Sequence, residues 1–304
     1  MAVLPNQAGF NLTMSKLQLV ELGWSDNKVL LENADEEYLA DFIDEEIKET
    51  KLLPLLQDAY NQITVRKTLG THYASFTLSA KLFKIVELPI ESLLTKEDLA
   101  EHLKWEYSIL FPRKNPEDLL IRYFEIGEHE NASIKKTLCA AVDKRFLAII
   151  HKFCVRNRLT MRLADNVHFA SNLLISSDLL QKNLMSVYGE DNYFSVMIFE
   201  KGKPKSFFSF EGDDLNEVFK NIHMEYENYL SRKSAPSVIN NIVTAGDSFN
   251  DPNLARFEKY YDIPVHRINP FSRLEEAPHL FNKDIITHRN YSFTGPVGIA
   301  ARIA

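Results

Sequence analysis

The spacing of apolar residues predicts a β-hairpin or meander followed by a long helix in the first part of the chain. Polar and apolar side chains alternate through residues 9–33 on both sides of the turn Trp24-Ser25-Asp26-Asn27, as in strands with one buried face. Apolar residues then recur every three or four positions from Leu39 to Ile63, which is the period of a helix. Pro54 lies within that stretch and should kink or split the helix, because its ring removes a backbone donor.

Strands and helices alternate through the middle of the chain. The stretch from Tyr73 to Leu88 has the composition of one strand and ends at Pro89. Thr95, with Asp98 three residues later, is a capping-box variant that begins a helix. The other elements predicted here are strands at Ile121–Ile126, Thr137–Val142 and Thr160–Leu163, and helices at Lys144–Asn157 and Asn166–Leu180.

The second half of the chain repeats this order. A hairpin of Phe194–Phe199 and Ser206–Phe210 precedes a helix that Asp213 or Asp214 begins and that ends near Arg232. A Ser/Pro linker then leads to a strand at Ile242, a helix at Asn253–Tyr261 and a strand at Pro264–Ile268. Since each half holds a hairpin, a helix and alternating strands and helices, we expect an α/β fold of two related lobes with a cleft between them.

The composition is that of a soluble globular protein and excludes several functions. Charged residues make up 25% of the 304 residues and hydrophobic residues 45%. A formal net charge of -7 argues against a general nucleic-acid or anionic-membrane surface. No apolar run is long enough to span a bilayer, and the first residues lack the regions of a signal peptide. We expect a cytoplasmic protein with no direct membrane span, in which Cys139 and Cys154 are buried and unreactive.

The segment from Ile239 to Phe271 carries the most specific chemical signal. An apolar run containing Ile242 and Val243 ends at Ala245-Gly246-Asp247, before a predicted helix. A strand that stops at a glycine-containing turn before a helix usually presents backbone N–H groups to an anion or a nucleotide. Two protein families contain segments of this kind, and the two imply different chemistry.

Several fragments together resemble the family of the type IV pilus assembly protein PilM, within the actin-like ATPase superfamily. They are, in the family's order, Gly9–Leu22, Glu87-Leu88-Pro89, Leu99–Glu106, Phe111-Pro112, Pro116–Tyr123, Lys136–Val142, Pro264-Val265, Asn269-Pro270-Phe271 and Gly295–Arg302. The match runs nearly end to end and implies the actin-like ATPase fold, with two related α/β lobes and a small inserted α/β subdomain. The first lobe is expected at 1–180, with the insertion at about 71–137, and the second lobe at 181–290. A C-terminal helix at 291–304 should return to the first lobe.

The phosphate-binding residues depart from the family's pattern. Actin-like ATPases hold Mg-ATP between two hairpins that each begin Asp-x-Gly, where the Asp orders metal-bound water and the Gly lets N–H groups approach phosphate. Asn11 and Thr13 stand in place of the Asp and the Gly of the first hairpin. The second hairpin should begin near Tyr188-Gly189-Glu190-Asp191, where no Asp-x-Gly occurs. Glu211, before Gly212, would place negative charge near phosphate.

We therefore expect an ATPase-like fold that does not act as an enzyme and needs no cofactor, with no catalytic residue and no metal site. The residues of its vestigial nucleotide cleft, as the resemblance places them, are Asn11, Thr13, Gly212, Gly246 and Asp247. The alternative is a weak ATP-binding protein or ATPase of the superfamily that still uses Asn11, Thr13, Gly212 and Gly246 with Mg.

The resemblance implies a non-catalytic cytoplasmic scaffold of an inner-membrane platform, as in type IV pili or type II secretion. Family members bind a short cytoplasmic tail of an inner-membrane protein in a groove beside the inserted subdomain. A protein partner of that kind is therefore expected, with attachment to the inner membrane through it and no nucleic acid. The predicted walls of the groove are the strand Phe76–Val86 and the helix Leu99–Leu110.

The stretch Gly246-Asp247-Ser248-Phe249-Asn250-Asp251 also resembles the Gly-Asp-x-x-Asn-Asp metal motif of haloacid-dehalogenase-like phosphatases. Those enzymes need an N-terminal Asp-x-Asp nucleophile to form an aspartyl-phosphate, and no Asp-x-Asp occurs in the chain. A phosphatase using Asp247 and Asp251 is therefore the weaker hypothesis. The preferred one is a helix N-terminus that Asn250 or Asp251 caps.

The other polar and aromatic clusters are assigned to structure rather than to chemistry. The nine His residues include no pair at helical spacing on one face, so no metal site is expected from them. The remaining assignments are a solvated acidic helix start for Glu36-Glu37 and Glu45-Glu46, a solubilising turn rather than a nucleic-acid patch for Lys201, Lys203 and Lys205, and core or lobe-interface positions for Trp105 and Tyr107.

Overall fold

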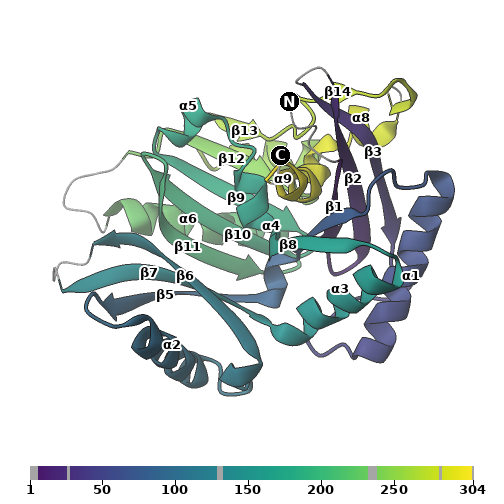
Figure 1. Cartoon of the computed structure of the whole chain (residues 1–304). Coiled ribbons are helices and arrows are strands. Elements are labelled where there is room, and N and C mark those ends of the chain that lie inside the picture. Colours follow the sequence, from purple (N-terminus) through teal and green to yellow (C-terminus); the bar gives the residue numbers. More distant parts are fainter. Residues whose placement is uncertain (1–5, 26–27, 129–132, 232–237, 281–282, 303–304) are drawn as a thin grey trace.

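Three β-sheets with helices on their faces organise the molecule (Figure 1). The computed structural model describes residues 6–25, 28–128, 133–231, 238–280 and 283–302. In the described chain, the first sheet has the strand order β14-β3-β2-β1-β4-β8, the second β11-β10-β9-β12-β13 and the third β5-β7-β6.

The strands are β1 (Gln7–Leu12), β2 (Lys16–Ser25), β3 (Lys28–Tyr38), β4 (Tyr73–Leu78), β5 (Phe83–Glu91), β6 (Leu119–Glu128), β7 (Ile134–Asp143), β8 (Thr160–Asn166), β9 (Leu184–Glu190), β10 (Tyr193–Glu200), β11 (Lys203–Glu211), β12 (Asn241–Ala245), β13 (Val265–Arg267) and β14 (Glu275–Glu276). The α-helices are α1 (Glu49–Arg66), α2 (Lys96–Leu110), α3 (Lys144–Arg156), α4 (Val167–Asn172), α5 (Ser177–Leu180), α6 (Leu215–Ser231), α7 (Asp251–Glu258), α8 (Asp284–Thr287) and α9 (Thr294–Ala301). Short 3-10 turns are η1 (Ala80–Leu82), η2 (Pro116–Asp118), η3 (Pro278–Leu280) and η4 (Asn290–Phe293).

The first and second sheets share one topology. In each sheet three consecutive strands form an antiparallel meander, β1-β2-β3 and β9-β10-β11. Two further strands add in parallel beside the first strand of the meander, β4 then β8 in one sheet and β12 then β13 in the other. A helix follows each meander, α1 after β3 and α6 after β11. The predicted α/β fold with two related lobes is confirmed, while positions 180 and 290 as boundaries stay a prediction.

The third sheet is inserted between β4 and β8 of the first sheet. Helix α2 covers one of its faces and buries Leu103 and Tyr107 against it, and the Tyr107 hydroxyl donates to the carbonyl oxygens of Lys84 and Cys139 at 2.9 Å each. The strands of this sheet begin at Phe83 and end at Asp143. The predicted insertion of about 71–137 therefore starts too early, because it includes β4, which pairs with β1 and β8 of the first sheet.

Two predicted elements are divided in the structure. The long strand from Tyr73 to Leu88 is two strands in different sheets, β4 and β5, separated by η1, which the Ser79 side chain caps. The helix at Asn166–Leu180 is two short helices, α4 and α5. Composition alone does not mark these breaks, since apolar residues continue through both stretches.

The long helix of the first half begins ten residues later than its apolar spacing predicts. Residues 39–48 precede α1 and bond to the β1–β2 turn instead, through Leu39 N to Ser15 O and Ile43 N to Met14 O, both at 2.8 Å. Ile43 and Ile47 are buried in the same core as α1, so their spacing resembles a helix. Pro54 lies in the second turn of α1, which runs on without a break to Arg66.

Strand β9 was missed in the sequence because every residue in it is buried. A central strand with helices or strands on both faces shows no alternation of polar and apolar residues. It is hydrogen-bonded to β10 on one side and β12 on the other. Its apolar residues pack into two cores on opposite faces of the second sheet.

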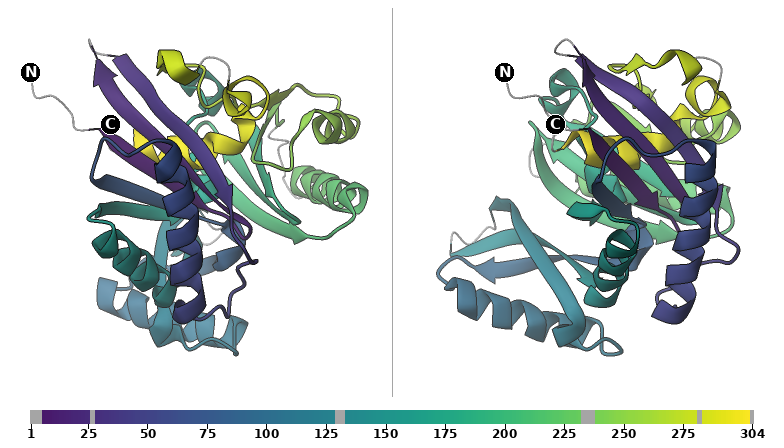
Figure 2. Two further views of the ribbon diagram at one scale, coloured as in Figure 1. Left: turned by 90° about the vertical axis from the view of Figure 1, so that its right-hand side faces the viewer. Right: turned by 45° about the vertical axis from the view of Figure 1, so that its right-hand side comes forward.

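Helices cover both faces of the first sheet (Figure 2). Alternate residues of β1, among them Phe10 and Leu12, pack with α1 and α3 on one face. The other face receives α4 and α9, so the C-terminal helix returns to the first sheet. Cys139 and Cys154 are buried and unpaired, as predicted, and burial raises the pKa of each thiol to about 12.

Gly9 permits α9 to lie directly on β1. A Cβ atom at this position would stand 2.0 Å from the carbonyl oxygen of Pro296 and 2.9 Å from the Cβ of Ala300. The obstacle is backbone, which cannot move aside without displacing α9. The glycine therefore sets how closely the C-terminal helix approaches the sheet.

We expect Gly9→Ala to lower the free energy of unfolding by about 1–3 kcal/mol or more, because overpacking a core moves backbone. Denaturant unfolding measures the loss. The matched control is Gly23→Ala, where the added methyl group would meet the flexible Glu32 side chain at 3.1 Å. Equal stability of the two variants would show that α9 is free to shift.

Candidate functional site

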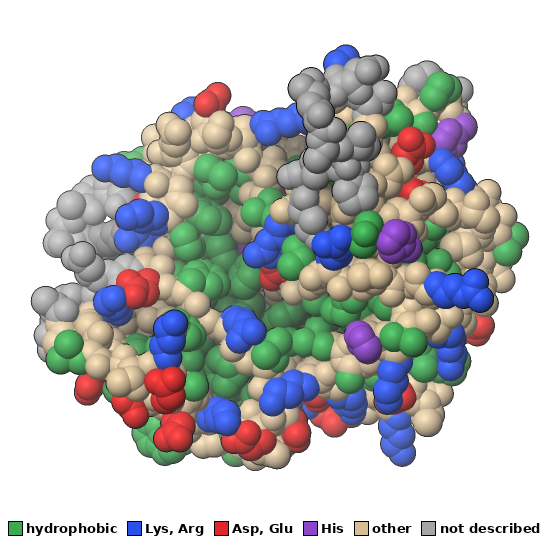
Figure 3. Space-filling view, in the orientation of Figure 1, with side chains coloured by type: hydrophobic (Ala, Val, Ile, Leu, Met, Phe, Trp, Pro, Cys, Tyr) green, Lys and Arg blue, Asp and Glu red, His purple; other side chains and the backbone are tan. Residues whose placement is uncertain are grey.

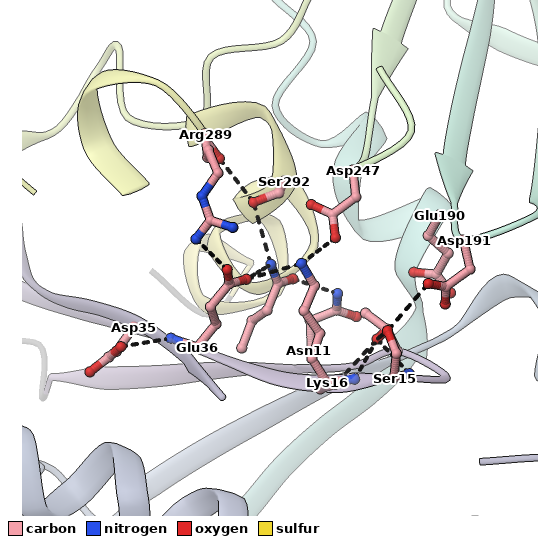
Figure 4. A network of polar contacts seen from close by, with 12 residues as sticks. Asn11, Ser15, Lys16, Asp35, Glu36, Glu190, Asp191, Asp247, Arg289 and Ser292 are labelled. Carbon is pink, nitrogen blue, oxygen red and sulfur yellow. Dashed lines mark hydrogen bonds and ion pairs between the residues drawn. The ribbon is translucent and has the colours of Figure 1, made fainter. Parts of the chain in front are cut away.

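The β1–β2 turn of the first sheet faces the β9–β10 turn of the second sheet (Figure 4). The Thr13 hydroxyl oxygen closes the β1–β2 turn by accepting from the backbone N–H groups of Ser15 (3.1 Å) and Lys16 (2.9 Å). The Ser15 hydroxyl then donates to Asp191 Oδ1 of the β9–β10 turn at 3.2 Å. The candidate site is therefore the interface between these two turns.

A row of buried polar side chains crosses four strands of the first sheet beside this interface. Thr77 on β4, Asn11 on β1, Gln18 on β2 and Glu36 on β3 are successive cross-strand partners. Thr77 Oγ1 donates to Asn11 Oδ1 (2.9 Å), Asn11 Nδ2 to Gln18 Oε1 (2.9 Å) and Gln18 Nε2 to Glu36 Oε2 (3.0 Å). Each amide is thereby oriented, and the row ends on a carboxylate.

Lys16 joins this polar row to the second sheet. Its side chain is 4% exposed, and its Nζ lies 3.0 Å from Glu36 Oε2 and forms a second ion pair with Asp247, in the turn after β12. Arg289 contacts the other oxygen of Glu36 at 2.5 Å. Burial alone would lower the pKa of Lys16, but the two carboxylates raise it above its ordinary value. The ammonium group therefore stays charged while buried.

The backbone N–H groups expected to cradle phosphate are bonded within the protein. Gly246, at φ +93°, donates to the Tyr291 carbonyl oxygen at 3.2 Å. Gly212 donates to Asn192 O and Thr13 to Lys16 O, each at 3.0 Å. A Cβ on Gly246 would stand 2.3 Å from Gly189 O, so this glycine serves the packing of two turns.

Carboxyl groups from the second sheet also border the interface. Glu190 is buried and accepts a hydrogen bond from the Tyr188 hydroxyl at 3.0 Å. Burial raises its pKa to about 8, and burial also raises the pKa of Asp191. The charge of Glu211, by contrast, is balanced by Lys81 at 2.5 Å, so it does not supply the repulsion expected from the sequence.

The structure places the predicted cleft residues at or beside the interface between the two turns, and two of them, Thr13 and Asp247, contact Lys16. Asn11, Thr13 and Asp247 belong to the contacts just described, Gly246 precedes Asp247, and Gly212 lies beside the second turn through Asn192. Their use for nucleotide stays a prediction. The described residues include no group of three or more His, Cys, Asp or Glu side chains placed to hold a metal ion.

The sequence interpretation missed Lys16 and misassigned Glu36. Glu36 does not lie in a solvated helix start, because it stands on β3 with a side chain only 6% exposed. Glu45 and Glu46 also precede the helix and form ion pairs with Lys84 and Lys114. The available signal was that Lys16 and Gln18 are polar residues at alternate positions, next to the apolar Leu17 and Leu19.

The phosphatase-like motif has a structural role here. The Asn250 side chain accepts from Asn253 N at 3.0 Å and caps α7, which confirms the capping interpretation. Asp247 is paired with Lys16, and Asp251 with Arg267 at 2.6 Å. Both carboxylates that the phosphatase hypothesis would need are thus held by cations.

A second candidate site is an apolar groove of about 610 Å³ between the third sheet and the other two (Figure 3). It is lined by Leu78, Phe83, Leu120, Arg122, Phe124, Ala140, Val142, Leu147, Leu163, Ala164, Asp165, Phe169, Asn172, Leu173, Leu180, Met197, Phe199, Gly202 and Arg302. Its walls are therefore β6 and β7 on one side, β8 and α4 on another, and β10 on the third. We call it the groove.

The groove is not formed by the walls predicted from the sequence. Of the strand Phe76–Val86 only Leu78 and Phe83 contribute, and α2 lies on the opposite face of the third sheet. Trp105 on α2 is 57% exposed, so it is not a core or interface residue, whereas Tyr107 is buried as predicted.

Comparisons with known proteins give the fold. No protein-family model matches the sequence, and no curated protein matches it. A solved structure of a PilM-PilN type IV pilus biogenesis complex is similar with a TM-score of 0.79 and 14% identity, over 98% of each chain. A protein of unknown function from Bacteroides thetaiotaomicron, described as having an actin-like ATPase fold, is similar with a TM-score of 0.54 and 13% identity, over 88% of this chain and 91% of that one.

The chain therefore has the actin-like ATPase fold, and its resemblance to PilM is confirmed at the level of the fold. Within the described residues, no helix is long and apolar enough to cross a membrane.

The buried Glu190 predicts a pH-dependent stability. Its pKa is about 8 in the folded protein and about 4.3 in an unfolded chain, so the folded protein holds a proton that the unfolded chain has released. The free energy of unfolding should therefore fall as pH rises from about 4.5 through about 8, by on the order of 5 kcal/mol. Denaturant unfolding at stepped pH measures this slope.

Glu190→Gln should remove that fall, since an amide has no proton to release. The control is Glu258→Gln, which changes an exposed carboxyl on α7 and should leave the slope as it is. Parallel slopes for the Glu190 variant and the unaltered protein would rule out a protonated Glu190.

Proposed function

We propose that this protein is a non-catalytic scaffold that holds a segment of an inner-membrane protein in the groove. The observation that carries the proposal is the groove itself, a cavity of about 610 Å³ with mostly apolar walls supplied by all three sheets. Folding leaves these walls uncovered, and Leu173 among them is 51% exposed. Apolar surface of this extent commonly marks an interaction site.

Loss of nucleotide chemistry is the second part of the proposal. Lys16 occupies the interface between the two hairpin turns, where Glu36 and Asp247 neutralise its charge. Any phosphate entering there would have to displace these ion pairs and would face Asp191 as well. The N–H groups of Gly246, Gly212 and Thr13 are already bonded. These contacts support a cleft that no longer uses Mg-ATP.

The partner follows from the resemblance. The similar structure is of a PilM-PilN complex from type IV pilus biogenesis. The resemblance to the PilM family implies a cytoplasmic tail of an inner-membrane protein as the bound segment. By analogy, this chain would work in the cytoplasm, attached to the inner membrane only through its partner. A role in a pilus or secretion platform fits a fold that keeps the two lobes while the phosphate motifs of both hairpins are altered.

We expect ATP with Mg to leave the melting temperature unchanged. Ligand binding stabilises a protein by RT ln(1 + [L]/Kd), so a Kd of about 10 μM at 1 mM ATP would add about 2.7 kcal/mol. Thermal shift with ATP, ADP and buffer, each with and without Mg, detects that amount. A magnesium-dependent turnover above roughly 0.1 per second, lost on changing Asn11 or Gly246, would support the residual ATPase instead.

Photo-crosslinking in the native host tests the scaffold. With benzoylphenylalanine in place of Leu173, we expect a crosslink to the cytoplasmic tail of an integral inner-membrane protein, identified by mass spectrometry. The matched control places the same group at Trp105, an exposed position on the far face of the third sheet. The proposal is wrong if Leu173 yields no membrane protein, or if Trp105 yields the same one in equal amount.

A further inference from the structure

The charged residues of the groove are not balanced within the described chain. Three of them line it: Arg122 on β6, Asp165 on β8 and Arg302 after α9. Arg302 and Asp165 form an ion pair with each other. Arg122 is exposed and has no ion-pair partner among the described residues. One cation is therefore left over beside apolar walls.

The β10–β11 turn adds further positive charge to the rim. Gly202 in this turn lines the groove. It lies next to Leu180, because a Cβ atom built on Gly202 would be 3.4 Å from the Leu180 carbonyl oxygen. Lys201 and Lys203 flank it, and neither forms an ion pair with another described residue. Figure 3 shows Lys and Arg side chains, with some Asp and Glu, around the apolar hollow. Of the charged side chains that line the groove or flank Gly202, those of Arg122, Arg302, Lys201 and Lys203 are cationic and that of Asp165 is anionic, on a chain whose net charge is -7.

We infer that the groove selects an extended peptide in which apolar side chains flank an acidic one, and that Arg122 pairs with this acid. The inference rests on the proposed docking function and adds the chemistry of the segment. A guanidinium offers planar, paired donors that match a carboxylate, and a seated peptide would exclude water from the pair. Phe124, two residues along β6 on the same face, and Leu173 across the groove would receive the apolar side chains.

The groove favours an extended segment over a flat anionic surface. Arg122 lies on β6, which is an edge strand of the third sheet and pairs only with β7 in the described chain. An edge strand can add an extended peptide through main-chain hydrogen bonds while side pockets select its side chains. A membrane surface would reach the exposed lysines of the rim but not the recessed apolar walls.

The test begins by selecting displayed peptides of random sequence on the immobilised full chain. The best binder is then synthesised with its acidic residue as Glu or as Gln, and fluorescence anisotropy gives both dissociation constants. The Glu peptide should bind about tenfold more tightly than its Gln form, as a charge-assisted hydrogen bond implies. Arg122→Gln should abolish this preference, whereas Arg113→Gln, which changes an exposed arginine after α2, should keep it.

The outcomes separate this inference from the docking function. Selected peptides that are apolar without acidic preference, or a preference that survives Arg122→Gln, overturn the role of Arg122 and leave docking supported. Peptides whose binding Leu173→Asp does not weaken overturn both, as does a selection without binders. Binding of phosphatidylglycerol but not phosphatidylcholine vesicles, dependent on Arg122 and without any peptide preference, would assign the rim to lipid and refute the inference.

Discussion

A buried ammonium group between two carboxylates holds the first sheet against the second. Lys16 contacts Glu36 within its own sheet and Asp247 across the interface, and almost none of its side chain reaches solvent. Taking one partner from such a group usually costs about 3–5 kcal/mol, because a charge is left buried without compensation. The polar row from Thr77 to Glu36 supports this arrangement by fixing the carboxylate that Lys16 needs. The relative position of the two sheets thus depends on a contact between the end of the β1–β2 turn and the turn after β12.

The sequence predicts the architecture well where local chemistry decides it. The meander of the first sheet, the Thr95 cap of α2 and the β10–β11 hairpin follow from periodicity and capping, whereas the C-terminal helix was expected from the family resemblance. Predictions failed where tertiary contacts prevail over local pattern. Ile43 and Ile47 reach the core from a segment that bonds to the β1–β2 turn, so their helical spacing does not reflect a helix. Strand β9 is buried on both faces, so it lacks the alternation of polar and apolar residues that marks a strand.

The sequence located the turns of the candidate site but not the contacts between them. The turns containing Thr13 and Gly246 could be located from motif order, and the structure puts them on either side of one interface. The partner of Asp247 could not be found, because Lys16 lies far from it along the chain. The position of the groove could not be predicted from the sequence for a similar reason. Its walls come from segments between Leu78 and Arg302, so only the packing of all three sheets creates it.

The building of the groove from all three sheets has a mechanical consequence. All three sheets contribute to the walls of the groove, and the backbone enters the third sheet near Ser79 and leaves it near Asp143. A segment bound in the groove would contact all three sheets at once. It would therefore link the third sheet to the other two by contacts besides the backbone. Tension applied by a membrane-anchored partner would then be shared among the three sheets instead of falling on a single strand. The groove would then connect the sheets mechanically as well as recognise the partner. Binding of a segment would reduce the motion of the third sheet relative to the other two.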